Sequence, residues 1–216
     1  IAVRWTKGGG SPTVRFRNAL ASLPAWHERL RNVVILRRNA FGIIDRFGGL
    51  MNPDGFTPEE VHALYLGKDG NTLRADGLIP HDELDELVWD MGAEIFLPCA
   101  ASRLVTVEHV KRLISGGLEL VSSGANVPFA DPEIFYGSTM AFADEHVSVI
   151  PDFIANCGMA RTFTMLMEGV GEVSDEAILG DVSRTIRTAL EQCHARSPHP
   201  TLLAATALEI ALDQLV

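Results

Sequence analysis

Four short, mostly apolar runs separated by segments with helical periodicity are the feature that most constrains this sequence. The runs are Ala40–Ile44, 94–97, 118–122 and 147–150. Strands that alternate with helices along a chain are typical of parallel βαβ units. We therefore expect an α/β fold with a Rossmann-like, open and mostly parallel sheet flanked by helices, followed by C-terminal helices.

The segments between the runs carry helix start signals. Thr57 followed by Pro58 predicts an N-cap with proline in the first turn, and Ser174 precedes two acidic residues that favour a helix N-terminus. Segment 154–168 is apolar, so we expect a buried helix there, and segment 48–55 is turn-rich. The expected helices are 57–66, 81–91, 107–114, 154–168, 174–194 and 201–215.

Small or polar residues follow each of the four runs. Asp45 follows the first, and the others end in 98–100, 124–126 and 151–152. Ligands of an open parallel sheet bind outside the carboxyl ends of its strands, where small side chains let a flat cofactor approach the backbone. Asp45 could accept hydrogen bonds from a ribose diol, which favours NAD. It could equally form a turn before Gly48, and the nearby Arg46 leaves NADP open.

A glycine-rich segment at 7–13 is the candidate phosphate loop. Gly8 and Gly10 have G-x-G spacing, but Thr13 stands where a third glycine is expected. The interval from Gly8 to Asp45 also exceeds the usual spacing of about 20 residues. The loop could still present backbone N–H groups to a pyrophosphate at a helix start, so Gly8, Gly10 and Ser11 are the candidate residues; it could equally be a flexible linker.

Charge is distributed unevenly along the chain. Residues 1–40 carry eight Arg or Lys against one Glu, a balance of +7, whereas the whole chain has a net charge of −10. The basic segment suits an internal or subunit contact. Sparse aromatic residues and the acidic remainder argue against nucleic-acid binding.

The cysteines and histidines predict neither a disulfide framework nor a metal site. Cys99, Cys157 and Cys193 are far apart and form no CxxC pair, and the seven histidines lack HxxxH spacing. Free thiols favour a reducing cytoplasm. No apolar run has the length of a membrane span.

Three sequence blocks give the chain a family likeness. The first is 42–55, an apolar strand with Asp45 and an Asn-Pro-Asp-Gly turn. The second is 95–101 with Val105-Thr106, and the third combines Gly-Ala-Asn-Val-Pro at 124–128 with 149–158. Their order and approximate spacing over about 175 residues resemble the cofactor domain of the glutamate/leucine/phenylalanine/valine dehydrogenases, most closely the glutamate type.

The resemblance implies NAD(P)-linked oxidative deamination of an L-amino acid to a 2-oxo acid, with hydride transfer to nicotinamide. It implies that Asp45 holds the adenosine ribose. Cys99, Ala100 and Ala101 would form a wall of small residues beside the cofactor. Asn126 and Asn156 would contact the nicotinamide half, because a carboxamide can donate and accept at once. A homo-oligomer is also expected.

Several departures from the family pattern leave an alternative open. Ser123 replaces a glutamate before Gly-Ala-Asn, and Met159 adds bulk where the family has glycine. Substrate lysines belong to a separate domain in the family, and Lys7 matches that motif only in part, so catalytic residues are not assigned. We expect residues 41–216 to form the dinucleotide-binding domain and 1–40 to be a poorly matched first unit. The alternative is a non-catalytic relative that serves as a binding or assembly module.

Overall fold

The structure is a computed structural model that describes residues 2–3, 40–70, 72–169 and 174–215. The predictions for Gly8, Gly10 and Ser11 lie outside the described residues. The strands are β1 (Ala2–Val3), β2 (Ala40–Ile44), β3 (Gly48–Phe56), β4 (Ile79–Pro80), β5 (Ile95–Phe96), β6 (Leu120–Ser122) and β7 (Ser148–Ile150). The helices are α2 (Pro58–Gly67), α3 (His81–Leu87), the 3-10 helix η2 (Val88–Asp90), α4 (Val107–Ser115), α5 (Ser138–His146), α6 (Asp152–Ala155), α7 (Gly158–Glu168), α8 (Asp175–Arg196) and α9 (Leu203–Asp213).

The described strands form one sheet in the order β4-β3-β2-β1-β5-β6-β7. The α/β, Rossmann-like class is confirmed, and β5, β6 and β7 pair in parallel as expected. The parallel part is smaller than predicted, because the pairings of β1 with β2 and β5 and of β3 with β2 and β4 are antiparallel. The pairing of β2 with β3 follows from their short connection, since a tight hairpin can join only antiparallel neighbours.

The segment predicted to be turn-rich, 48–55, is strand β3. It pairs with β2 through a hairpin whose turn is closed by Asp45, which accepts the backbone N–H groups of Phe47 at 2.7 Å and Gly48 at 3.2 Å. Gly48 adopts a φ of +153°, a conformation that side chains disfavour. The glycines and the aspartate that suggested turns therefore shape the end of a hairpin and permit close strand packing.

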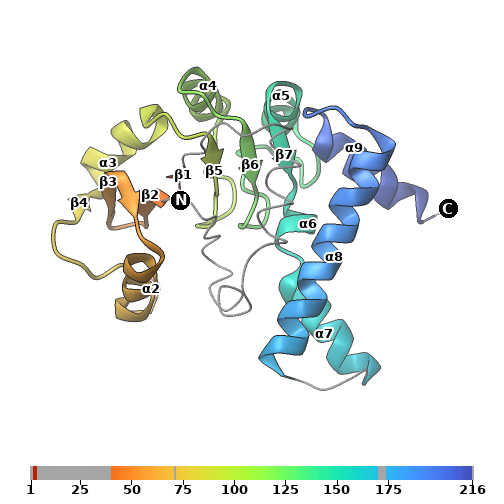
Figure 1. Cartoon of the computed structure of the whole chain (residues 1–216). Helices are drawn as coiled ribbons and strands as arrows, with labels where there is room; N and C mark the ends of the chain where they lie inside the picture. Colours follow the sequence, from red (N-terminus) through yellow and green to blue (C-terminus); the bar gives the residue numbers. More distant parts are fainter. Residues whose placement is uncertain (1, 4–39, 71, 170–173, 216) are drawn as a thin grey trace.

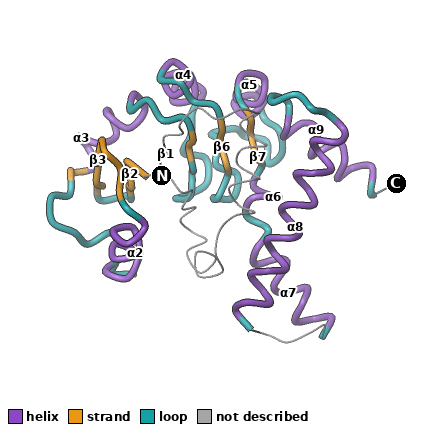
Figure 2. The backbone as a smooth tube through the Cα atoms, in the orientation of Figure 1, coloured by secondary structure: helices purple, strands orange, loops and turns teal. Residues whose placement is uncertain are grey.

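Side chains alternate between the two faces of the parallel strands. Phe96, Val121 and Val149 belong to one apolar cluster with residues of α4 and α5. Ile95 and Leu120 belong to a second cluster with residues of α6, α8 and α9. Helices thus cover both faces of β5–β7, as Figures 1 and 2 show. Burial on both faces explains why these strands are continuous apolar runs in the sequence.

The predicted buried helix at 154–168 is wrong. Two helices, α6 and α7, replace it, and the chain breaks between them at Asn156, whose φ of −111° and ψ of 22° are not helical. No residue of α7 is buried. Its apolar side chains lie on an outward face, and α7 extends with the first part of α8 away from the sheet (Figure 1). Apolar composition alone could not distinguish such a face from a core face.

Two predicted helix starts are confirmed by their caps. The Thr57 hydroxyl accepts the N–H of Glu60, whose carboxylate accepts the N–H of Thr57 in return. The Ser174 hydroxyl accepts the N–H of Ala177 at 3.3 Å. Among the described residues, no helix combines the length and apolarity needed to cross a membrane.

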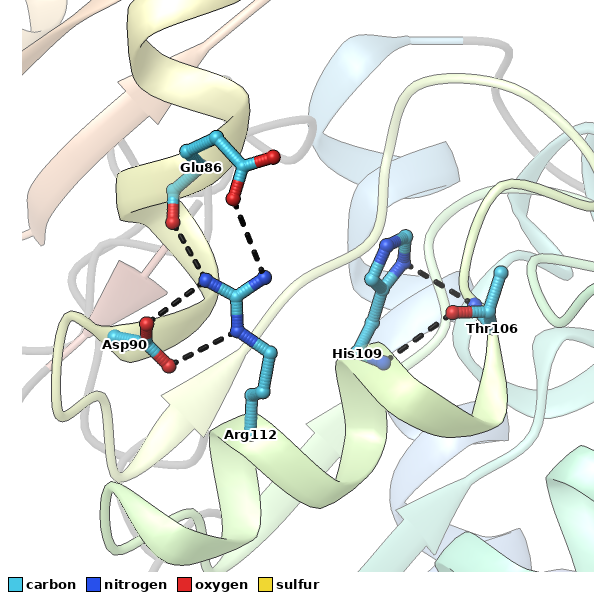
Figure 3. A network of polar contacts seen from close by, with 5 residues as sticks. All are labelled: Glu86, Asp90, Thr106, His109 and Arg112. Atoms are coloured by element: carbon cyan, nitrogen blue, oxygen red, sulfur yellow. Dashed lines mark hydrogen bonds and ion pairs between the residues drawn. The ribbon is translucent and has the colours of Figure 1, made fainter.

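A polar network fixes α4 against the preceding helices (Figure 3). The Arg112 guanidinium binds the Asp90 carboxylate through two nitrogens, at 2.8 and 3.0 Å, and donates to the Glu86 carbonyl at 2.6 Å. At the other end of α4, Nδ1 of His109 accepts the N–H of Thr106 while its ring stacks on Trp89. Burial lowers the pKa of His109, which keeps that nitrogen available as an acceptor.

Candidate functional site

The carboxyl ends of β5, β6 and β7 are joined directly by backbone hydrogen bonds. The N–H of Ala125 donates to the carbonyl of Pro98 at 2.8 Å, and the N–H of Ser123 donates to the carbonyl of Ile150 at 3.1 Å. Consecutive strand ends therefore form one continuous edge rather than three separate loops. This is the edge at which α/β sheets bind ligands.

Two side-chain amides meet at this edge. Nδ2 of Asn156 donates to Oδ1 of Asn126 at 2.7 Å, although thirty residues separate them in the sequence. Both side chains are exposed. A carboxamide has two donor hydrogens and an acceptor oxygen, so the pair retains donors on Asn126 and acceptor capacity on Asn156 for a ligand.

A wall of small side chains lies beside the amides. Cys99, Ala100 and Ala101 follow β5 and are all exposed. Gly124 packs so closely here that an added Cβ would lie 2.6 Å from Sγ of Cys99. The close approach of the β5 and β6 loops therefore depends on a residue without a side chain.

Asp45 lies at the same sheet edge but also forms a turn. Gly42 and Phe96 both pair with Ala2 in antiparallel register, so β2 and β5 run in the same direction with β1 between them. Gly42 is thus about 10 Å, or two strand spacings, from Phe96, and Asp45 lies three residues further along the chain. Besides its two turn contacts, its Oδ2 accepts the N–H of Leu73 at 2.5 Å. The turn-forming alternative is therefore observed, and one of about four acceptor positions of the carboxylate is left for a ribose hydroxyl.

Ser123, which replaces the glutamate of the family pattern, has a physical consequence in the structure. Its side chain is completely buried, and its Oγ has no hydrogen-bond partner. A serine here leaves the edge without the carboxylate that the family pattern would place before Gly124. Among the residues that the structure describes, Asp45 and Asp152 are acidic groups that lie near the strand ends.

The sequence placed Asp152 at a strand end without giving it a role, and the structure shows that it contacts the loop that bears Asn126. Its Oδ2 accepts the N–H of Val127 at 2.7 Å. In the same loop, the carbonyl of Val127 accepts the N–H of Arg103 at 2.8 Å. Proximity of Asp152 to a strand end was visible in the sequence, but its partner is 25 residues away and required the fold.

The assembled edge suits recognition of a ligand that offers an amide and a flat, apolar surface. Paired carboxamides supply complementary donors and acceptors, and the small residues leave the backbone accessible. Within the described residues, no group of three or more His, Cys, Asp or Glu is placed to bind a metal ion. The fold and this edge together define a Rossmann-like α/β domain with two carboxamides at the carboxyl edge of its parallel strands.

Comparison with known sequences identifies the family. A sequence model of the Glutamate/Leucine/Phenylalanine/Valine dehydrogenase family matches residues 31–214, and the chain belongs to this family. The NADP-specific glutamate dehydrogenase of Haemophilus influenzae is 32% identical over 88 residues, which are 39% of this chain and 20% of that protein. The NAD-specific glutamate dehydrogenase A of Halobacterium salinarum is 30% identical over 116 residues, 54% of this chain and 24% of that protein.

Solved structures agree on the fold. Plasmodium falciparum glutamate dehydrogenase superposes with a TM-score of 0.59 at 17% identity, over 96% of this chain and 52% of that chain. The hetero-hexameric glutamate dehydrogenase of Thermus thermophilus, in a Leu-bound form, gives a TM-score of 0.59 at 18% identity. The match covers 94% of this chain and 50% of that chain. The chain thus spans about half the length of these structures and a quarter or less of the two curated relatives.

Proposed function

We propose that residues 41–216 form the NAD(P)-binding domain of an amino-acid dehydrogenase that deaminates an L-amino acid, glutamate-like, to its 2-oxo acid. The observation that carries the proposal is the contact between Asn126 and Asn156 at the carboxyl edge of the parallel strands. Bound NAD(P) would accept the hydride of the substrate α-carbon. The substrate domain and its catalytic groups would be supplied from outside this chain.

Each residue of the edge has a defined part in this proposal. Asn126 and Asn156 would bind the nicotinamide carboxamide, and Cys99, Ala100 and Ala101 would face the cofactor. Gly8, Gly10 and Ser11 remain the proposed pyrophosphate loop. Asp45 would accept a ribose hydroxyl and repel a 2′-phosphate, which favours NAD over NADP. The free thiols of the three cysteines support a reducing cytoplasm as the compartment.

Calorimetric titration of the folded protein with NAD and with NADP tests the proposal. We expect binding of NAD, weaker binding of NADP, and roughly tenfold weaker NAD binding in Asn126→Ala and in Asn156→Ala, because each removes one hydrogen-bonding group from the edge. Asn52→Ala is the control, since Asn52 bonds within the β3 segment. Absence of heat with both nucleotides would favour the non-catalytic binding or assembly module.

We also propose that copies of this chain associate through α7. Met159, Phe163, Leu166 and Met167 are each at least half exposed on this helix. Four such side chains expose on the order of 400 Å² of apolar surface, comparable to the largest apolar patch of a typical monomer, which is often functional. A second copy that packs its own α7 against this face would bury it on both molecules.

Analytical ultracentrifugation over a concentration series measures this association. Phe163→Ser and Met167→Ser should each raise the dimer dissociation constant at least tenfold, because a buried apolar side chain contributes about 1.5–3 kcal/mol and the dimer contains two copies of each. Leu215→Ser removes another exposed leucine and should leave the constant unchanged. A wild-type protein that stays monomeric at high concentration would contradict the proposal.

A further inference from the structure

One residue, Asp152, holds the backbone of both segments that carry the paired amides. Its Oδ2 accepts the N–H of Val127, which directly follows Asn126, at 2.7 Å. Its main-chain carbonyl accepts the N–H of Asn156, also at 2.7 Å. The β6 loop and the end of α6 are therefore linked through a single amino acid. The bond to Asn156 is the backbone bond that closes α6, whereas the bond to Val127 is made by the side chain and is specific to aspartate.

Val127 adopts a conformation that needs such support. Its φ of +46° lies in the left-handed region, which a β-branched residue strongly disfavours. A strained residue persists only where its surroundings over-determine it, and such residues concentrate at ligand sites. The Val127 N–H donates to Asp152 and the Val127 carbonyl accepts the N–H of Arg103, so the peptide groups on both sides of Val127 are held. The bond to the carboxylate is the charge-assisted one, and such bonds are stronger than neutral ones.

The surroundings of Asp152 fix the carboxylate in turn. The residue is half-buried and lines a small apolar hollow together with Tyr136, Phe153 and Leu208. Oδ1 accepts the N–H of Phe153 at 3.0 Å, so the two oxygens have separate partners. The side chain is therefore held in one orientation before any ligand is present.

We propose that Asp152 is a positioning residue for the nicotinamide half of the cofactor. It holds Asn126 against Asn156 so that the remaining donor and acceptor of the pair face a ligand carboxamide together. This inference rests on the proposed function for its ligand, but the positioning itself is a property of the free protein. Asp152 contacts neither the substrate nor the cofactor in this assignment.

Two measurements on the same variants separate positioning from a general structural role. The first is the NMR signal of the Asn156 side-chain amide in the free protein, which reports the hydrogen bond to Asn126. The second is the ratio of the dissociation constants for ADP-ribose and NADH, which isolates the nicotinamide half. The variants are Asp152→Ala, which removes both oxygens, and Asp152→Asn, which keeps one acceptor. Asp131→Ala is the matched control, because Asp131 accepts the N–H groups of Thr139 and Met140 at the start of α5.

In Asp152→Ala we expect the Asn156 amide signal to move and the preference for NADH over ADP-ribose to fall about tenfold, with ADP-ribose affinity within about twofold of wild type. In Asp152→Asn, the Asn156 amide signal and the preference for NADH should both lie between those of wild type and Asp152→Ala. Asp131→Ala should lower the melting temperature and change neither readout. If Asp152→Ala does not fold, Asp152→Asn decides with the same two readouts.

An unchanged Asn156 amide signal in the folded Asp152 variants would overturn the positioning role, and so would an unchanged ratio of dissociation constants. An equal change of both readouts in Asp131→Ala would overturn it as well, since the effect would then be general loosening. If wild type binds neither nucleotide, the proposed function fails, and the amide signal still decides whether Asp152 positions the pair.

Discussion

Replacement of Asp144 by alanine is expected to lower the free energy of unfolding by about 3 kcal/mol, because its carboxylate caps a helix that has no cap of its own. Asp144 is fully buried in α5, and its two oxygens accept the N–H groups of Ala204 and Ala205 at 2.9 Å in the first turn of α9. Leu202, at the N-cap of α9, makes no side-chain bond there. Alanine would leave both N–H groups without an acceptor, next to a cavity.

The position of α9 explains why this loss would spread. The helix contacts β7, the edge strand of the sheet, and both α5 and α8. Its buried Ala204 belongs to one apolar cluster, and its Leu203 and Ala207 belong to the other. A loosened α9 would therefore expose the apolar clusters on both faces of the sheet near β7. In chemical denaturation, Asp144→Ala should lower the denaturant concentration at the midpoint and leave the slope of the unfolding free energy against denaturant unchanged. Tyr136→Phe is the control, because it removes only one donor to Asp144 and should cost about 1 kcal/mol.

Asp144 also gives this prediction a pH dependence. Burial raises the pKa of its carboxyl, against the opposing effect of the N–H groups of Ala204 and Ala205 and the hydroxyl of Tyr136. Folding therefore favours the protonated form. The resulting stability is complete below the unfolded pKa of about 3.9 and is lost as the pH rises through the higher folded pKa. The advantage of wild type over Asp144→Asn should thus be larger at pH 4 than at pH 7. If wild type and Asp144→Asn differed equally in their free energy of unfolding at pH 4 and at pH 7, this pH dependence would be contradicted.

Local signals predicted most of the secondary structure, and long-range contacts account for what was missed. Thr57 and Ser174 marked helix starts because a cap and its partner are three residues apart. Asp144 caps a helix sixty residues later, and no pattern in the sequence indicates that pairing. Strand β3 was missed because its glycine, asparagine and proline composition is that of a turn, whereas pairing with β2 makes it a strand. The outward face of α7 was missed because composition does not report which side of a helix is covered.

For the candidate site, the sequence suggested residues but not the contacts between them. Asn126 and Asn156 were assigned to the same half of the cofactor, and the structure places them in contact. The resemblance to a family carried that assignment; their spacing alone would not have. The sequence left Asp45 open between a ribose contact and a turn, because one carboxylate has enough acceptor positions for both. The sequence placed Asp152 at a strand end but did not show its contact with Val127, because that contact depends on the folded backbone of both segments.

Replacement of Gly48 by alanine is expected to cost about 4 kcal/mol and to weaken NAD binding as well. A φ of +153° is nearly exclusive to glycine and costs about 1–3 kcal/mol for other residues. An added Cβ would also overlap the backbone carbonyl of Ile79 in β4, which cannot move without breaking the β3–β4 pairing. Overpacking of this kind adds about 1–3 kcal/mol. For a chain of this length the melting temperature should fall by about 10 °C.

The link from Gly48 to the ligand edge is Asp45. The Asp45 N–H donates to the Gly48 carbonyl, and the Gly48 N–H donates back to Oδ1 of Asp45, so a shifted Gly48 reorients the carboxylate. Gly117→Ala is the matched control, because Gly117 has a φ of +99° but no atom within 4 Å of an added Cβ. It should cost about 1–2 kcal/mol for its backbone conformation alone and leave NAD affinity unchanged. Equal melting temperatures for the two variants would show that steric overlap with β4 is not what requires glycine at position 48.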